Sequence, residues 1–222
     1  MLRGIFITGT DTNVGKTVVA AACLHRYRRQ GPLCYWKPIQ TGIESDDDTA
    51  TVRRLGDCEE TEVFDQGVRL LRPLSPHLSA RLAGTQIDIE PLVRLIDEPH
   101  KRAIWIVEGA GGILVPINET QLMTDLIQRL ALPTVIVARS GLGTINHTLL
   151  TLEALRPRSL PIAGVVMVGD MNKDNRAAIE QFGGLPVLGE MPPFPQLTPE
   201  GLKHWAQAEL DPSGLLAEYF DD

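Results

Sequence analysis

The chain has 222 residues, of which 43% are hydrophobic and 22% charged, and its formal net charge is −7. Length and apolar content predict one α/β domain, residues 1–222, with a sizeable core. The acidic balance argues against a general nucleic-acid binder, which would carry a basic face, but one local basic site would be enough to bind a phosphate-bearing small molecule.

Targeting signals and disulfides are not expected. The N-terminus has only a short apolar run, and no run approaches the roughly 20 apolar residues of a membrane span. The three cysteines, Cys23, Cys34 and Cys58, form no CxxC pair and no zinc spacing. An odd cysteine count fits a reducing compartment better than a secreted disulfide scaffold. We therefore expect a cytoplasmic protein that binds neither nucleic acid nor membrane.

Short apolar runs recur along the chain, and most are rich in Val and Ile without alternation, which is typical of strands buried on both faces of a parallel sheet. The expected strands are Gly4–Thr8, Leu33–Trp36, Ala103–Val107, Thr134–Ala138, Ile162–Val168 and Pro186–Leu188. The expected helices are Val18–Arg29, Pro91–Glu98, Leu122–Leu130, Ile145–Leu155, Asn175–Phe182 and Pro199–Ala208. This alternation predicts an α/β fold with a doubly wound, mostly parallel sheet flanked by helices, and ligands at the carboxyl ends of the strands.

The segment Gly9–Thr17, GTDTNVGKT, lies between the first expected strand and helix, which is the context of a phosphate-binding P-loop. Lys16 can reach the β- and γ-phosphates, and Thr17 can place its hydroxyl on magnesium. Five residues separate Gly9 from Gly15 where the usual pattern has four, so Thr10 stands where the first glycine is expected. The residues expected to bind the nucleotide here are Thr12, Asn13, Val14, Gly15, Lys16, Thr17 and Val18.

Two charged residues directly follow other expected strands. Lys37 follows a strand that we expect to neighbour the first one, and Glu108 follows Ala103–Val107. Both then lie on the ligand side of the sheet. Lys16 and Lys37 together suit a reaction that accumulates anionic charge, and Glu108 resembles a Walker B carboxylate that holds magnesium directly or through water. The glycines that let ligands approach this turn closely are Gly109, Gly111 and Gly112.

The acidic cluster Glu44–Asp48 is expected to form a loop. It contains three adjacent aspartates, Asp46, Asp47 and Asp48, and we expect one of them to supply another oxygen to magnesium. At the other end of the chain, the tail after Asp211 is expected to be loosely held.

Six motifs, in chain order, resemble the dethiobiotin synthetase family. They are GTDTNVGKT at Gly9–Thr17, KPIQTG at Lys37–Gly42, SPH at Ser75–His77, EGAGG at Glu108–Gly112, GTINHTLLT at Gly143–Thr151 and LGEMP at Leu188–Pro192. The resemblance spans nearly the whole chain and implies a P-loop NTPase-like fold and an ATP-dependent cyclo-ligase of biotin biosynthesis that uses Mg2+. In the implied reaction, 7,8-diaminononanoate takes up CO2 as a carbamate, ATP phosphorylates the carbamate to a mixed anhydride, and the second amine closes the cyclic urea of dethiobiotin.

The resemblance also implies roles for single residues. Lys16 and Lys37 are implied to be catalytic, with Lys37 meeting the carbamate and phosphate. The implied metal ligands are Thr17, Asp48 and Glu108, and Asp47 stays open as an alternative to Asp48. Residues implied to face the diamine and carbamate are Thr12, Lys37 and Thr41.

A second group of implied roles lies later in the chain. Gly143, Thr144, Ile145 and Asn146 resemble a helix start that receives the substrate's carboxylate tail from a partner subunit, which implies a homodimer; a helix N-terminus is a natural anion receptor. Gly109 and Gly111, and backbone near Gly189 and Pro192, are implied nucleotide contacts. His77 and His147 lie in family-like motifs but are interpreted as structural hydrogen-bonding residues.

One position departs from the family pattern. The family often has a base-reading asparagine after the strand that here ends at Val168, but this chain continues Val168-Gly169-Asp170, and Asn172 is out of register. The preference for adenine therefore stays open.

Two other P-loop classes remain as alternatives. A corrinoid amide-forming ligase would usually carry a glutamine-hydrolysing domain with a cysteine nucleophile, for which this chain offers neither room nor a suitable cysteine motif. A switch ATPase of the partitioning or metal-delivery type often has a further lysine at the loop start, where this chain has Thr10 and Asp11. A switch ATPase should hydrolyse ATP without diamine and bicarbonate, whereas the ligase needs both.

Overall fold

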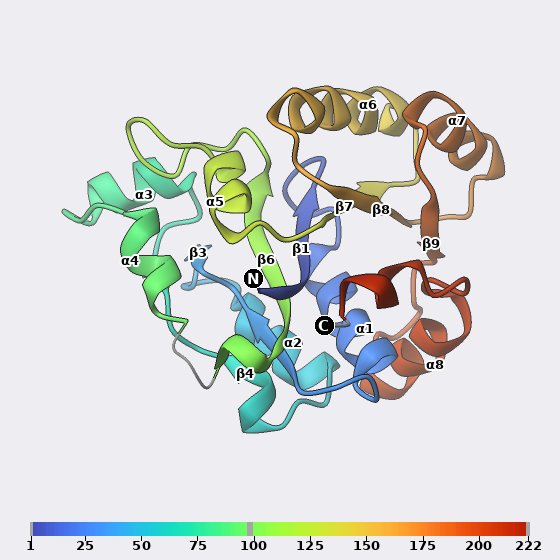
Figure 1. The fold of residues 1–222 in the computed structure, drawn as a ribbon, viewed down its shortest axis with the longest axis horizontal. Coiled ribbons are helices and arrows are strands. Elements are labelled where there is room, and N and C mark those ends of the chain that lie inside the picture. Colours follow the sequence, from blue (N-terminus) through green and yellow to red (C-terminus); the bar gives the residue numbers. More distant parts are fainter. Residues whose placement is uncertain (1, 97–99, 221–222) are drawn as a thin grey trace.

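A seven-stranded parallel sheet forms the centre of the computed structural model, which describes residues 2–96 and 100–220. Its strand order is β4-β2-β6-β1-β7-β8-β9, with crossovers in both directions from β1 (Figure 1). The strands are β1 (Arg3–Gly9), β2 (Leu33–Trp36), β4 (Val63–Phe64), β6 (Ile104–Gly112), β7 (Thr134–Arg139), β8 (Ile162–Val168) and β9 (Val187–Met191). The expected doubly wound α/β fold is confirmed.

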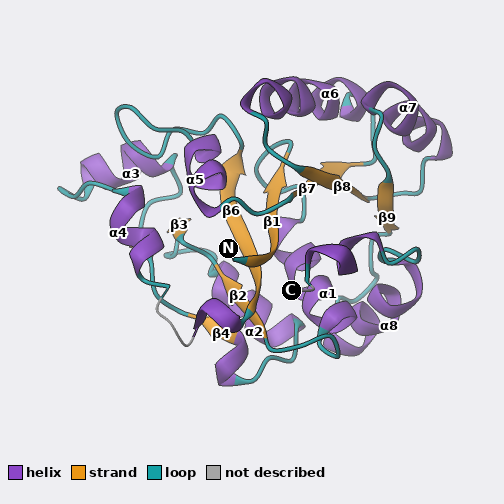
Figure 2. Ribbon diagram, viewed as in Figure 1, coloured by secondary structure: helices purple, strands orange, loops and turns teal. Residues whose placement is uncertain are grey.

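Helices cover both faces of this sheet (Figure 2). One face packs against α1 (Lys16–Tyr27), α2 (Asp48–Leu55) and α8 (Pro199–Glu209). The other face packs against α3 (Pro76–Leu82), α4 (Ile89–Arg94), α5 (Met123–Leu130), α6 (Thr144–Leu155) and α7 (Lys173–Gly183). Along β1, Ile5 and Ile7 pack in the core on the side of α1, α2 and α8, whereas Phe6 packs in the core on the side of α3 to α7. This is the alternation that the two-residue period of a strand requires.

A separate two-stranded parallel sheet joins β3 (Ile39–Thr41) to β5 (Val68–Leu70) beyond the end of β2. It holds the segment after Lys37 against the edge of the cavity described below. Four 3-10 turns complete the described elements, at Glu60–Glu62, His100–Arg102, Arg156–Arg158 and Leu215–Tyr219.

The structure matches the expected strands Leu33–Trp36 and Ile162–Val168 residue for residue, and the other expected strands have shifted ends. The order of the strands was predicted wrongly: β6 lies between β1 and β2, so the strand before Lys37 does not neighbour the first strand. The third strand is also longer than expected, because it continues through Glu108 to Gly112. Short elements that were not predicted are β3, β4, β5, α2 and α3.

Two further expectations are wrong. The acidic cluster is not wholly a loop, since Asp48 begins α2. The tail after Asp211 is firmly packed as far as residue 220: Leu216 and Phe220 are buried, and the Phe220 ring meets Tyr27 edge-on at 4.7 Å between centroids. The expected helix Pro91–Glu98 is observed as α4, which begins at Ile89 and already ends at Arg94; residues 97–98 lie outside the described residues.

No helix in the described ranges is both long and apolar enough to span a bilayer.

Candidate active site

The loop between β1 and α1 is shaped by two left-handed residues, Asn13 with φ 56° and Gly15 with φ 100°. Gly15 is the N-cap of α1, so the free N–H groups of the helix start face the loop. Lys16 is only 6% exposed, and its Nζ donates to the Asp11 carbonyl at 2.9 Å, which folds the side chain back over the loop. This is the geometry of a P-loop anion cradle.

The unusual glycine spacing has a steric reason. A Cβ on Gly9 would lie 2.7 Å from Val14 Cγ2 and 3.1 Å from Lys16 Nζ. Glycine at position 9 therefore makes room for the lysine that bends back over the loop, while the next residue, Thr10, is fixed by its N–H to the Val137 carbonyl at 3.0 Å.

Lys37 lies at the centre of a buried charge cluster. Its Nζ is 2.7 Å from Glu108 Oε1 and 2.7 Å from Asp48 Oδ2, and it donates to the Gly109 carbonyl at 3.1 Å. Lys37 is 3% exposed and Glu108 1%. Lys16 follows β1 through the P-loop, and Lys37 directly follows β2. Because β6 lies between β1 and β2, Glu108 on β6 lies between these two strands.

The two lysines respond differently to burial. Burial alone would lower the pKa of Lys37, but the ion pairs with Glu108 and Asp48 outweigh it and raise the pKa above the ordinary value. Burial, together with the nearby charge of Lys37, lowers the pKa of Lys16 to about 8. Lys16 thus lacks the carboxylate partners that Lys37 has, and an anionic phosphate would supply that missing charge.

Three oxygen-bearing side chains converge beside Lys37. The Thr17 hydroxyl lies 2.8 Å from Asp48 Oδ1 and 3.0 Å from Glu108 Oε1, and it donates to one of them at a time. Burial would raise the pKa of Asp48, but Lys37 and the hydrogen bond from Thr17 lower it below the ordinary value. A hydroxyl and two carboxylates are hard oxygen ligands of the kind that Mg2+ takes together with phosphate oxygens. Among the described residues no group of three His, Cys, Asp or Glu side chains forms a metal cluster.

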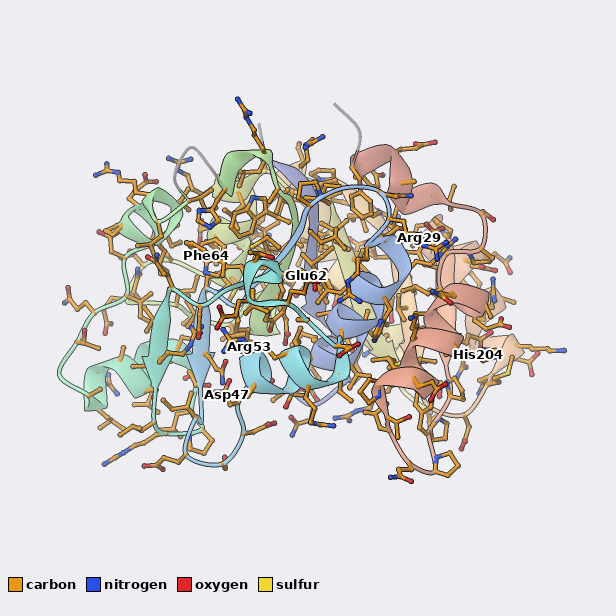
Figure 3. The ribbon with its side chains drawn as sticks, turned by 90° about the horizontal axis from the view of Figure 1, so that it is seen from below. Arg29, Asp47, Arg53, Glu62, Phe64 and His204 are labelled. Carbon is orange, nitrogen blue, oxygen red and sulfur yellow. The ribbon has the colours of Figure 1, made fainter. Side chains whose placement is uncertain are left out.

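Asp47 and Asp48, which sequence alone left as alternatives, have different contacts. Asp47 is the N-cap of α2: its Oδ1 accepts from the Ala50 N–H at 3.1 Å and from Gln40 Nε2 at 3.2 Å. Figure 3 shows Asp47 where the chain enters that helix. Asp48, one residue on, turns to Thr17 and Lys37. Asp47 is therefore a helix cap, whereas Asp48 shares its two oxygens with Thr17 and Lys37.

These groups face one cavity of about 720 Å³ at the carboxyl ends of β1, β2 and β6. The expected site residues that line it are Thr12, Asn13, Gly15, Lys16, Thr17, Val18, Lys37, Thr41, Asp46, Asp48, Glu108 and Gly111. Lining residues that sequence reasoning had not assigned to the site are Gly42, Ser45, Thr51, Pro73, Leu74, Ser75, Pro76, Ala110 and Val115. Four of these lie within the quoted motifs: Gly42 in KPIQTG, Ser75 and Pro76 in SPH, and Ala110 in EGAGG.

Other expected residues lie elsewhere. Val14 points into the core, and Gly109 offers its carbonyl to Lys37. Neither Gly189 nor Pro192 is among the cavity's lining residues, and the same holds for Gly143, Thr144, Ile145 and Asn146 at the start of α6. Asn172 caps α7 through its Oδ1, which accepts from the Asn175 N–H at 3.0 Å.

The two histidines also stand apart from the cavity lining. The backbone N–H of His77 donates to the Pro116 carbonyl at 3.3 Å, and the backbone N–H of His147 donates to the carbonyl of Gly143, the N-cap of α6, at 3.1 Å. Nδ1 of the His77 ring is buried without a hydrogen-bond partner in the described structure. Their catalytic use is not indicated by any contact with Lys16, Lys37 or Glu108.

Sequence reasoning assigned no role in the site to three supporting residues, although Gln40 lies within the KPIQTG motif. Tyr35 donates its hydroxyl to Glu108 Oε2 at 2.8 Å, Gln40 ties down the start of α2, and Arg69 donates to the Lys37 carbonyl at 2.9 Å. Burial raises the pKa of Tyr35 well above its ordinary value, and the negative charge of Glu108 adds to this effect. A tyrosine within an apolar strand is indistinguishable by sequence from a core residue.

Comparison with known proteins adds a family to this geometry. A sequence family described as AAA domain matches residues 3–201. The ATP-dependent dethiobiotin synthetase BioD of Paramagnetospirillum magneticum is 52% identical over 198 residues, covering 89% of this chain and 91% of the relative. The BioD protein of Agrobacterium fabrum is 44% identical over 203 residues, covering 91% and 92%. The biotin biosynthesis bifunctional protein BioCD of Bordetella avium is 46% identical over 92% of this chain but only 43% of its own length.

Solved structures agree on the fold. The septum site-determining protein MinD of Pyrococcus horikoshii, complexed with Mg-ADP, superposes with a TM-score of 0.59 at 15% identity, covering 99% of this chain and 93% of MinD. A ParA family ATPase of Chlorobium tepidum gives 0.57 at 11% identity, covering 92% and 98%. These likenesses show the P-loop fold alone, whereas the two BioD relatives, matched over 91% and 92% of their lengths, place this chain in the dethiobiotin synthetase family.

Proposed function

We propose that this chain is an ATP-dependent cyclo-ligase that forms dethiobiotin from 7,8-diaminononanoate (7,8-diaminopelargonate) and CO2, releasing ADP and phosphate. Family membership supports the reaction. The structural observation that carries it is that Lys16 and Lys37 line one cavity together with Thr17, Asp48 and Glu108. The switch ATPase and the corrinoid ligase have no comparable support.

The reaction divides into three bond changes. One amine of the diamine adds to CO2 and loses a proton, which gives a carbamate. A carbamate oxygen attacks the γ-phosphorus of ATP, the bond to the β-phosphate oxygen breaks, and ADP leaves. The second amine then attacks the carbamate carbon, the carbon–oxygen bond to phosphate breaks, and the nitrogen loses a proton, so that the cyclic urea and free phosphate are formed.

The charged side chains fit the second step. A carbamate and a triphosphate repel each other, so bringing them together requires cations between them. Lys16, bent over the phosphate loop, serves the phosphates, and Lys37, fixed by two carboxylates, meets the carbamate and the transferring phosphoryl group. Holding the second amine beside the mixed anhydride makes ring closure effectively unimolecular, an advantage of about 7 kcal/mol or more. Thr12 and Thr41, which both line the cavity, are proposed to contact the diamine and carbamate.

Thr17, Asp48 and Glu108 would hold Mg2+, because Asp48 Oδ1 and Glu108 Oε1 both lie within 3.0 Å of the Thr17 hydroxyl oxygen. Bound there with the nucleotide, Mg2+ would neutralise charge on the phosphate oxygens. Each carboxylate is shared with Lys37, so this chain's own residues keep the site charge-balanced and oriented. Gly109 and Gly111, and the backbone at Gly189 and Pro192, stay predicted nucleotide contacts.

We further propose a homodimer. The start of α6, Gly143–Asn146, does not contribute to its own chain's cavity lining, and its N-cap Gly143 is left-handed with φ 92°. Leu142, just before this helix, is fully exposed, and Leu150 on α6 is also exposed. A second copy covering these leucines would bring the helix start to the other subunit's substrate, where the N-terminus can bind the carboxylate tail. We also propose that the protein acts in the cytoplasm and that residues 1–222 form one P-loop domain.

The test is a mass-spectrometric assay for dethiobiotin with diamine, bicarbonate, ATP and Mg2+, each omitted in turn. We expect product and phosphate release only when all four are present. Phosphate release that ignores the diamine and bicarbonate would instead support a switch ATPase. Lys203→Met, on the exposed side of α8, provides a charge-loss control away from the cavity.

A further inference from the structure

The Glu108 carboxylate is held at both oxygens by two residues of one neighbouring segment. Lys37 Nζ lies 2.7 Å from Oε1, and the Tyr35 hydroxyl donates to Oε2 at 2.8 Å. Positions 35 and 37 are two residues apart at the end of β2, so their side chains project to the same face of the sheet. All three residues are at most 3% exposed, so solvent does not compete for these contacts.

We propose that Tyr35 is a positioning residue of the magnesium site, because its hydroxyl holds Oε2 so that Oε1 is the oxygen presented to Thr17 and Lys37. This inference rests on the proposed function, since it takes Glu108 as a metal-holding residue. Nothing in the motifs points to Tyr35: it lies in the run Leu33–Trp36, before the KPIQTG motif begins.

The need for such a contact follows from the shape of glutamate. The last torsion of a glutamate side chain has a broad minimum, so packing alone fixes its two oxygens poorly. Lys37 has three N–H donors and, with Oε2 free, could draw both oxygens of Glu108 to itself. The phenol occupies Oε2 and leaves Oε1 3.0 Å from the Thr17 hydroxyl. Hydrogen bonds that orient a metal-binding carboxylate in this way are typically worth 10–100-fold in metal affinity or activity.

The chain contains a matched control at the far end of α1. The Tyr27 hydroxyl donates to Asp211 Oδ2 at 2.7 Å, and both residues are buried. Tyr27→Phe therefore removes the same kind of phenol–carboxylate hydrogen bond, at equal burial, without touching the cavity. A general loss of stability would affect both variants, whereas a loss of metal positioning would affect only Tyr35→Phe.

The experiment is a calorimetric titration of ADP into wild type, Tyr35→Phe and Tyr27→Phe over a series of Mg2+ concentrations and in EDTA, with thermal melting of each protein. We expect Tyr35→Phe to raise the apparent Kd for Mg2+ by about 10–100-fold while ADP binding in EDTA stays unchanged. Tyr27→Phe should lower the melting temperature but leave the Mg2+ dependence as in wild type.

A Tyr35→Phe protein that titrates with Mg2+ like wild type, or that shifts together with Tyr27→Phe, would overturn the positioning role. Wild-type binding that ignores Mg2+ would overturn the metal site itself, and with it the role of Tyr35. If Tyr35→Phe does not fold, a crystal structure of the wild type with Mg2+ and ADP decides: the proposal requires the Tyr35 hydroxyl on Glu108 Oε2, and a hydroxyl turned elsewhere would refute it.

Discussion

The carboxyl ends of β2, β6 and β1 can be compared with those of β7, β8 and β9. The two regions differ in how many of their expected site residues line the cavity of the same chain. In the first region, Lys37, Asp48, Glu108 and Thr17 contact one another at 2.7–3.0 Å inside the cavity. In the second, the start of α6 and the expected base contacts on β9 do not line that cavity. The region around Lys37 is thus organised by contacts within the chain, while the other region contributes no residue to the cavity and exposes Gly143 and Asn146 at the start of α6.

This contrast separates two kinds of chemistry. Lys37 is matched by two carboxylates, so the first region holds its charges in place before the reaction adds more, which is the condition for electrostatic catalysis. The start of α6 offers only a helix end. Its specificity for an anion depends on the subunit or ligand that docks against it. Substitutions at Lys37, Thr17 and Asn146 test this division.

The largest effect is expected for Lys37→Met. Loss of this ammonium should lower kcat by about 10²–10³-fold, because the charge is needed mainly as the phosphoryl group transfers. ATP affinity should change far less. Steady-state kinetics and calorimetric ATP binding measure the two separately, with Lys203→Met as control. Equal losses in both would mean that Lys37 only binds ground-state phosphate.

The same substitution should also cost stability when Mg2+ is absent. It leaves the buried Glu108 carboxylate, and the half-buried Asp48, without their shared cation, and breaking a buried ion pair in this way typically costs about 3–5 kcal/mol. Urea unfolding with and without Mg2+ would show this as a destabilisation that the metal partly relieves.

Thr17→Val should act next most strongly. Valine keeps the shape of threonine but removes the hydroxyl between Asp48 and Glu108, so Mg2+-dependent nucleotide binding should weaken by about 10–100-fold. Nucleotide binding in EDTA should hardly change. Thr134→Val is the control, because the buried Thr134 hydroxyl has no hydrogen-bond partner in the described structure. An unchanged Mg2+ titration in Thr17→Val would remove Thr17 from the metal site.

Asn146→Asp tests the second region. A carboxylate in the first turn of α6 would repel the substrate's carboxylate tail and should raise KM for the diamine about tenfold, with KM for ATP unaffected. Mixing this variant with Lys37→Met then distinguishes a shared site. In mixed dimers, the site that retains Lys37 receives Asn146 from the other subunit, so a fraction with wild-type KM should reappear. A mixture showing only the raised KM would place the whole site within one chain.

Sequence predicted the parts of this molecule that have strong local signals. Buried Val- and Ile-rich runs marked most strands, and the glycines and lysine of the P-loop marked the phosphate cradle. The strand order could not be predicted, because no local sequence pattern indicates that β6 lies between β1 and β2. Tyr35 and Gln40 were missed for a related reason: each acts through a contact across strands or loops, 2.8 Å from Glu108 Oε2 and 3.2 Å from Asp47 Oδ1, that no spacing in the chain encodes.

The acidic cluster shows the same limit most clearly and gives the smallest predicted effect. Three adjacent aspartates look alike in sequence, but helix geometry separates them, since Asp47 caps α2 and Asp48 begins it. Asp47→Ala should therefore cost about 1 kcal/mol of stability, the usual value of an N-cap, and leave the Mg2+ titration nearly unchanged. Asp48→Asn should do the reverse, weakening Mg2+-dependent binding more than stability. If urea unfolding and Mg2+ titration showed the opposite pattern, the metal would belong to Asp47, and α2 would have to start in a different register from the one that brings Asp48 to Lys37.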